Sequence, residues 1–142
     1  TSAICTSFKQ ELLVGTHNFT ATTGNTFKIA LYTSSATLGA GTTAFSTTNE
    51  ITNSSGTAYT SGGASLTSVT PTTDSTTAVC DFSDVSFTSA SFTANGALIY
   101  NSSQSNKAVA VIAFGGDKTV SSGTFTIQFP TADATNAIIR LA

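Results

Sequence analysis

The amino-acid sequence predicts a mainly β domain, an antiparallel β-sandwich or barrel-like fold with one short N-terminal helix. Three observations lead to this fold class. Short apolar segments recur at intervals of roughly 8–15 residues, with turn-forming residues between them. Ser and Thr make up roughly a third of the chain, and Thr suits a pleated sheet whereas Ser and Gly suit its turns. The hydrophobic content of 39%, with 10 Phe, is too high for a disordered chain.

The length and charge of the chain limit its organisation and its partners. With 142 residues, residues 1–142 are predicted to form a single domain. The five Lys and Arg are scattered singly and the net charge is -2, so no direct contact with nucleic acid is expected. No apolar run approaches the ~20 residues of a membrane-spanning helix, so no membrane partner is expected. The opening TSAICTSF lacks the regions of a signal peptide, which favours folding in a cytoplasm.

The segment 6–15, TSFKQELLVG, is the one predicted helix. It has an apolar stripe with a spacing of four residues, and Thr6 or Ser7 can cap its first turn, with Gln10 or Glu11 returning a capping-box bond. Gly15 is the expected stop, because glycine readily adopts the left-handed conformation that ends helices. A helix of two to three turns needs tertiary contacts to persist.

The remaining elements are predicted to be strands. A long Ser/Thr/Gly-rich connection over 34–76 interrupts them, and short strands are considered near Phe45, Ile51, Tyr59 and Leu66. A bulge is expected where Asp81 to Asp84 break the alternation, and FGGDK (114–118) is expected to be a turn with an exposed lysine. The predicted strands are 27–33, 77–87, a hairpin of 91–100 with 107–114, then 123–129 and 137–142.

The run from Ala108 to Phe114 is apolar throughout and carries no charge. A strand with one face in water should alternate, so both faces of this strand are expected to be covered. The favoured cover is a second sheet of the same chain, and the alternative is a neighbouring protomer. The connection over 34–76 and the N-terminal segment are the best candidates to reach another protomer.

The sequence offers little material for catalysis or metal binding. His17 is the one histidine, and no G-x-S-x-G motif accompanies it. Its position after the predicted helix favours a stabilising role at the negative end of the helix dipole. Cys5 and Cys80 are distant in sequence, so with one histidine they do not make a usual zinc site. Without secretion signals we expect both thiols to be free and buried.

The acidic and aromatic residues also favour structural roles. Asp81 and Asp84 could supply oxygens for calcium, but solvated charges at a strand bend are the favoured interpretation. Glu50 is the candidate for a carboxylate pair of a glycosidase, yet no spacing places an aspartate beside it. The three tyrosines could stack on sugars but are expected to be ordinary strand residues, and SGGAS and FGGDK lack phosphate-binding spacing. We therefore predict no catalytic residue, no cofactor, no metal and no enzyme activity; the tyrosines are Tyr32, Tyr59 and Tyr100.

Several segments of the chain resemble small virion structural proteins of tailed bacteriophages. The resemblance extends from Phe8 to Ala142 and is weakest from Gly39 to Ser75. It implies a capsid decoration, or cement, protein that binds the outer surface of the assembled capsid and bridges neighbouring major capsid subunits. It also implies a homotrimer located on the virion and assembled in the host cytoplasm. The segments are TSFKQELLVGTHNF (6–19), NTFKIALYTSSATL (25–38), GALIYNSS (96–103), AVAVIAFGGDK (108–118) and FTIQFPTADATNAIIRLA (125–142).

Two alternatives remain open at this point. The first is a tail or fibre component that binds a host surface glycan, for which Tyr59, Asp81 and Asp84 are the only support. The second is a secreted adhesion domain, which is disfavoured because a start at a small residue and the lack of any Met fit simple loss of the initiator Met.

Overall fold

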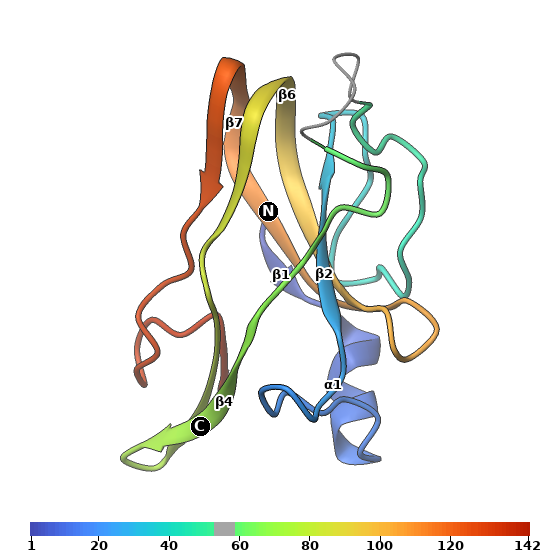
Figure 1. Ribbon diagram of the computed structural model, residues 1–142. Helices are drawn as coiled ribbons and strands as arrows, with labels where there is room; N and C mark the ends of the chain where they lie inside the picture. Colours follow the sequence, from blue (N-terminus) through green and yellow to red (C-terminus); the bar gives the residue numbers. More distant parts are fainter. Residues whose placement is uncertain (53–58) are drawn as a thin grey trace.

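The computed structural model describes residues 1–52 and 59–142, and this part of the chain is mainly β. It holds two antiparallel sheets and one helix, so the predicted fold class is confirmed (Figure 1). The larger sheet has the strand order β1-β7-β6-β2-β3 and the smaller has the order β4-β5-β8. The elements are β1 (Ala3–Ile4), α1 (Thr6–Leu13), β2 (Phe27–Tyr32), β3 (Ala64–Ser65), β4 (Ser68–Asp74), β5 (Thr77–Phe82), β6 (Val85–Asn101), β7 (Lys107–Ile127) and β8 (Ile139–Leu141).

Strands β6 and β7 form one long, bent ribbon of 17 and 21 residues. Figure 1 shows the ribbon bending over one end of the molecule, so that its closed end lies beside β2 and its open end lies in the opposite layer. The predicted strands 107–114 and 123–129 are therefore parts of one strand. The prediction of a turn at 114–118 is wrong: residues 114–117 form a bulge opposite Asn95, because Ala94 pairs with Lys118 and Gly96 with Ala113.

Two glycines explain why this bulge does not end the strand. Gly115 and Gly116 have φ angles of 79° and 147°, which residues with a side chain rarely adopt. The chain can therefore place extra residues outside the ladder and then resume pairing. Lys118 is exposed at this bulge, as predicted.

Strand β2 lies between β6 and β3, and both of its faces are buried by the protein's own chain. On one face Phe27 stacks on Phe19, with ring centroids 4.2 Å apart. On the other face the Tyr32 hydroxyl donates to the carbonyl of Ser46 at 2.7 Å. The segment that follows β2 thus folds back over the sheet, which explains why 27–33 is buried at nearly every position although its sequence alternates.

The same segment reaches the apolar part of β7. The amide of Ala108 donates to the carbonyl of Thr43 at 3.0 Å, and Val109 is completely buried. Phe45 stacks on Tyr100 of the neighbouring strand, with centroids 4.6 Å apart. The cover of Ala108 to Val111 is therefore intramolecular, but the connection after β2 contributes to it in place of the predicted second sheet, and residues 112–114 are only partly buried.

The connection over 34–76 contains more regular structure than its composition indicates. Isolated bridges lie at Ala44 and Glu50, next to the predicted positions Phe45 and Ile51, and β3 lies next to Leu66. Strand β4 was not predicted and corrects the boundary of the connection. Five of its seven residues pair with β5 although six of the seven are exposed, so burial did not mark it in the sequence. Residues 53–58 of the predicted connection lie outside the described residues.

The predicted strand 77–87 is two strands that belong to different sheets. Strand β5 ends at Phe82 and β6 begins at Val85, so no bulge lies between Asp81 and Asp84. The Asp84 carboxylate accepts a hydrogen bond from the amide of Phe129 at 2.9 Å. This bond fixes the chain at the place where it passes from one sheet to the other. The predicted strand 137–142 is confirmed in its central part as β8.

Helix α1 begins and ends close to the predicted residues. Its N-cap is Cys5, which makes no side-chain capping bond, so the predicted capping box does not form. Its C-terminus matches the prediction: Gly15 has a φ angle of 76°. The amide of Gly15 donates to the carbonyl of Leu12, and the amide of Thr16 donates to the carbonyl of Glu11. This pair of hydrogen bonds is the pattern of a Schellman motif. In the part of the chain that the structure describes, no helix has the length and hydropathy to span a membrane.

Candidate functional site

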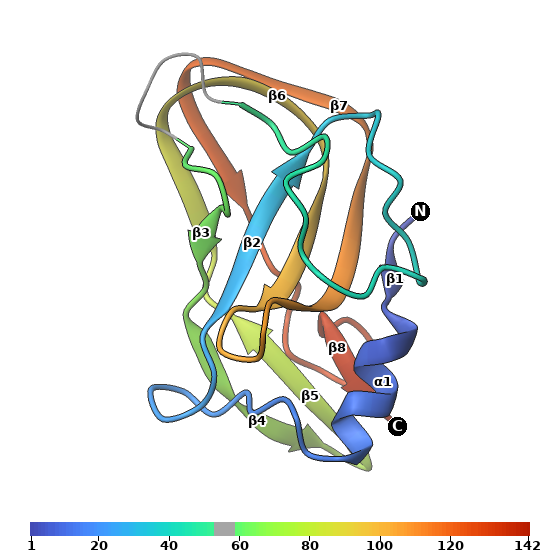
Figure 2. The ribbon, with the colours of Figure 1, turned by 90° about the vertical axis from the view of Figure 1, so that its right-hand side faces the viewer.

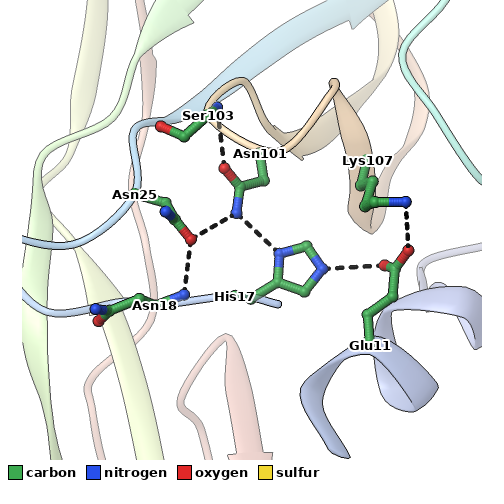
Figure 3. A network of polar contacts seen from close by, with 7 residues as sticks. All are labelled: Glu11, His17, Asn18, Asn25, Asn101, Ser103 and Lys107. Atoms are coloured by element: carbon green, nitrogen blue, oxygen red, sulfur yellow. Dashed lines mark hydrogen bonds and ion pairs between the residues drawn. The ribbon is translucent and has the colours of Figure 1, made fainter. Parts of the chain in front are cut away.

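His17 lies at the centre of a buried polar network that joins α1 to the closed end of the β6–β7 ribbon (Figure 3). Its side chain is fully buried, and its Nε2 lies 3.0 Å from Oε1 of Glu11. Its Nδ1 lies 3.0 Å from Nδ2 of Asn101. The second carboxylate oxygen of Glu11 lies 3.3 Å from Nζ of Lys107. Two stretches that are distant in sequence, 11–17 and 101–107, thus meet through the imidazole of His17 and the carboxylate of Glu11.

Backbone amides fix the direction of the hydrogen bonds in this network. The amide of Asn18 donates to Oδ1 of Asn25 at 2.8 Å, and the amide of Ser103 donates to Oδ1 of Asn101 at 3.1 Å. A backbone N–H can only donate, so both of these oxygens are acceptors and Nδ2 of Asn101 must point to Asn25 and His17. The Nδ1 atom of His17 is then an acceptor. The ring N–H proton lies on Nε2, and this N–H donates a hydrogen bond to Glu11.

This arrangement favours a structural role for His17. Both ring nitrogens are already engaged with protein groups, so neither is free to accept a proton from a substrate. The stabilising role proposed from the sequence is therefore supported, but its source is a set of direct hydrogen bonds to Glu11 and Asn101. The sequence did not indicate Asn25, Asn101 or Lys107; the one available signal was an asparagine that ends the apolar run GALIY.

Glu50 is the centre of a second buried cluster. Its Oε2 accepts hydrogen bonds from the Tyr59 hydroxyl at 2.6 Å and from the amide of Gly62 at 2.7 Å. Its Oε1 accepts one from the Ser61 hydroxyl at 2.8 Å. The Tyr59 oxygen in turn accepts from the amide of Leu31 in β2 at 2.9 Å. The cluster attaches Glu50 and residues 59–62 to the edge of β2. The donors of all of these hydrogen bonds are neutral groups.

The three tyrosines are buried and do not form a platform for sugars. Tyr32, Tyr59 and Tyr100 are exposed by at most 4%. Burial raises the pKa of Tyr59 above its ordinary value, and the hydrogen bond to Glu50 raises it further. Burial also raises the pKa of Tyr100 to about 12, with a smaller contribution from the Glu50 charge. These hydroxyls therefore stay protonated and act as hydrogen-bonding groups of the core.

The carboxylates and thiols considered from the sequence do not come together. Asp81 accepts a hydrogen bond from the amide of Phe82, and Asp84 is engaged with Phe129. Within residues 1–52 and 59–142, no group of three or more His, Cys, Asp and Glu side chains could hold a metal ion. Cys5 and Cys80 are free, as predicted, but Cys5 alone is fully buried and Cys80 is partly buried. Burial raises the pKa of Cys80 to about 11.

One end of the molecule exposes apolar side chains to solvent. Among the described residues, the large hydrophobic side chains that are exposed are Leu13 at 90%, Val14 at 67%, Leu141 at 59% and Val69 at 42%. All four belong to α1, its C-cap, β4 or β8, and Figures 1 and 2 show these elements together at one end of the fold. We call this surface the apolar end.

A groove of about 430 Å³ opens in the apolar end between α1 and the small sheet. None of the residues that line it is an acid, a lysine or an arginine. The exposed residues Leu13 and Val14 adjoin it in sequence, and Leu141 is part of its wall. Its apolar lining consists mainly of Phe8, Leu12, Phe19, Pro71, Val79 and Ile139.

Comparisons with models of protein families, with curated proteins and with solved structures found no match to this chain.

Proposed function

We propose that this chain is a non-enzymatic virion protein that binds the outer surface of an assembled bacteriophage capsid and stabilises it. The resemblance of its segments to small virion proteins is the origin of the proposal. The observation that carries it is the apolar end, where Leu13, Val14, Val69 and Leu141 are exposed on neighbouring elements. Leu13 and Val14 adjoin the apolar groove in sequence and Leu141 lines it, and exposed apolar patches mark interaction sites.

The apolar end suits a weak contact that is repeated many times. Burying one Leu or Val side chain contributes about 1.5–3 kcal/mol, and part of this offsets the entropy lost on association. A single copy would therefore bind modestly. A homotrimer that presents three such ends to neighbouring major capsid subunits would bind far more tightly through effective concentration. The trimer and the position on the virion are parts of this proposal.

The glycan-binding alternative has lost its support among the described residues. Tyr59 is buried against Glu50, and Asp81 and Asp84 accept hydrogen bonds from backbone amides. No other observation favours a fibre component, so we propose the capsid role alone.

The proposal is tested by adding the purified protein to phage heads that lack it. We expect binding to expanded heads in fixed stoichiometry and heads that resist breakage better. The double variant Leu13→Ser/Leu141→Ser should stay folded, because both side chains are already in water, and should bind at least ~10-fold more weakly, which corresponds to about 1.4 kcal/mol.

Lys118→Ala serves as the control, because Lys118 is exposed on the bulge of β7, outside the apolar end. It should bind as the unchanged protein does. Unchanged binding of the Leu13→Ser/Leu141→Ser variant would refute the role of the apolar end. Failure of the unchanged protein to bind any heads would refute the proposed function.

A further inference from the structure

The hydrogen bonds around His17 accommodate one ring proton but not two (Figure 3). The Nε2–H group donates to the Glu11 carboxylate, and Nδ1 accepts from the Asn101 amide, at 3.0 Å each. A second proton would lie on Nδ1 and point at Nδ2 of Asn101, which is itself a donor. The neutral ring therefore fits the fold, whereas the imidazolium would set two donors against each other at the end of β6.

Rotation of the Asn101 amide does not remove this conflict. Its Oδ1 accepts from the amide of Ser103 at 3.1 Å, and its Nδ2 also donates to Oδ1 of Asn25 at 3.0 Å. Turning the amide over would set Nδ2 against the N–H of Ser103, and Oδ1 against Oδ1 of Asn25. The Asn25 oxygen also accepts from the amide of Asn18 at 2.8 Å, so turning Asn25 as well would break that bond. A second ring proton thus costs hydrogen bonds whichever side chain turns.

The charged groups near the imidazole favour its protonation on one side only. Glu11 of α1 contacts Nε2 directly, and Lys107 of β7 lies 3.3 Å from the other oxygen of Glu11. Strands β2 and β6 face the ring with Phe27 and Asn101, which do not titrate. Cys80 of β5 and two apolar residues of β8 line the same groove as the ring, and burial raises the pKa of the Cys80 thiol to about 11, so it stays neutral. The imidazolium would therefore keep its bond to Glu11 and lose the one to Asn101.

This contact supports one wall of the groove in the apolar end. His17 and the three residues that follow it line the groove, across from residues of β4, β5 and β8. The bonds from Asn101 to His17 and Asn25 hold this wall against the end of β6. Loss of the bond to His17 would free the wall to move, so the shape of the groove depends on a single proton.

We propose that His17 is a pH-sensitive switch of the apolar end: uptake of a second ring proton releases Asn101 and loosens residues 17–25, while the ring stays bound to α1. Histidine is the side chain that changes charge between about pH 5 and 8, and a buried charged donor without an acceptor is costly. The switch is a property of the free protein and does not depend on the proposed capsid role.

Nitrogen NMR of the ring tests the switch directly, because His17 is the one histidine of the chain. At about pH 7.5 the ring should be neutral, with its proton on Nε2. As the ring takes up its second proton on the way to about pH 5, the amides of Asn18 and Ser103 should lose hydrogen-exchange protection at least ~10-fold in the same pH range. The amide of Thr33, which follows β2 and donates to the carbonyl of Asn49, is the internal control and should stay protected.

One substitution should reverse the direction of the effect. Asn101→Asp replaces the donor that faces Nδ1 with a carboxylate oxygen, which accepts a hydrogen bond from the imidazolium. In this variant the amides of Asn18 and Ser103 should be better protected at about pH 5 than at about pH 7.5. Asn106→Asp is the matched control, because it makes the same change of charge at an exposed position in the turn after β6. It should respond to pH as the unchanged protein does.

Several results would overturn the switch. These are a ring proton on Nδ1 at about pH 7.5, a ring that stays neutral down to about pH 5, and a protonated ring with Asn18 and Ser103 still protected. An equal loss of protection at Thr33 would show general unfolding and would also refute it, as would an Asn101→Asp variant with an unreversed response. The titration uses the unchanged protein, so it decides the matter even where Asn101→Asp does not fold.

Discussion

Asn101 shows how strongly one polar residue can determine the structure around it. It is completely buried at the end of β6, and each polar atom of its amide has a partner. Because it bonds to His17 and Asn25, it holds the loop that follows α1 against the large sheet. The sequence marked His17 as the residue to consider, but a buried asparagine has no periodicity that would reveal it.

The network predicts a graded loss of stability on substitution. His17→Ala removes a fully buried ring and one hydrogen-bond partner each from Asn101 and Glu11, so the free energy of unfolding should fall by about 2–4 kcal/mol. Lys107→Ala removes a side chain that is 40% exposed and should cost less than about 1 kcal/mol. Urea denaturation of the three proteins measures both values. Equal losses for the two variants would contradict the assigned roles.

The cysteines give a second prediction at this scale. Burial raises the pKa of Cys80 to about 11, and a free cysteine has a pKa of about 8.5. The folded chain therefore keeps this proton as the pH rises past 8.5, whereas the unfolded chain loses it, so the free energy of unfolding falls progressively between about pH 8.5 and pH 11. At pH 8 the thiols of the folded protein should react with a thiol reagent at least ~100-fold more slowly than those of the urea-unfolded protein. Rapid labelling of Cys80 in the folded state would contradict this environment.

Among the elements, the sequence was most informative where a local rule determines the structure. The apolar stripe and Gly15 predicted α1, because helix stops depend on one residue and its φ angle. It was least informative where pairing is decided between distant segments. Strand β4 is exposed on nearly every residue, so it has no apolar pattern, and its existence depends on its partner β5. The continuity of β7 through Gly115 and Gly116 likewise depends on β6, which keeps pairing on both sides of the bulge.

The end of α1 gives the prediction at the scale of the element. Gly15→Ala would place a side chain at a φ angle of 76°, although no atom lies within 4 Å of the added Cβ. The cost is conformational, and we expect a loss of about 1–2 kcal/mol. Gly39→Ala is the matched control, because its Cβ also has open space but its φ angle lies outside the left-handed region. It should be neutral or slightly stabilising. A Gly15→Ala variant as stable as Gly39→Ala would refute the Schellman interpretation, and thermal unfolding measures both.

At the scale of the whole molecule, the chain uses its apolar residues in three places. Most fill the space between the two sheets and under the segment after β2. A second set lines an open groove beside β7, and a third is exposed at the apolar end. Composition and periodicity predicted the first place. The other two depend on which sides of the two sheets the rest of the chain leaves uncovered. A sequence alone does not show this.

The polar groups show a complementary distribution. His17 and Glu50, the most deeply buried titratable residues apart from the tyrosines and Cys5, are both saturated with hydrogen bonds inside the fold. Reactive residues are thus used to hold segments together, while the hollows of the surface are lined mainly by apolar side chains. The proposed binding role rests in part on the exposed apolar hollows.

Cryo-electron microscopy of virions that contain this chain tests that role most directly. We predict density for the β domain on the outer surface of the head, in regular stoichiometry, with α1 and β8 directed toward the major capsid protein. Density for the domain on the tail, or on the head with α1 and β8 directed into solvent, would contradict the account.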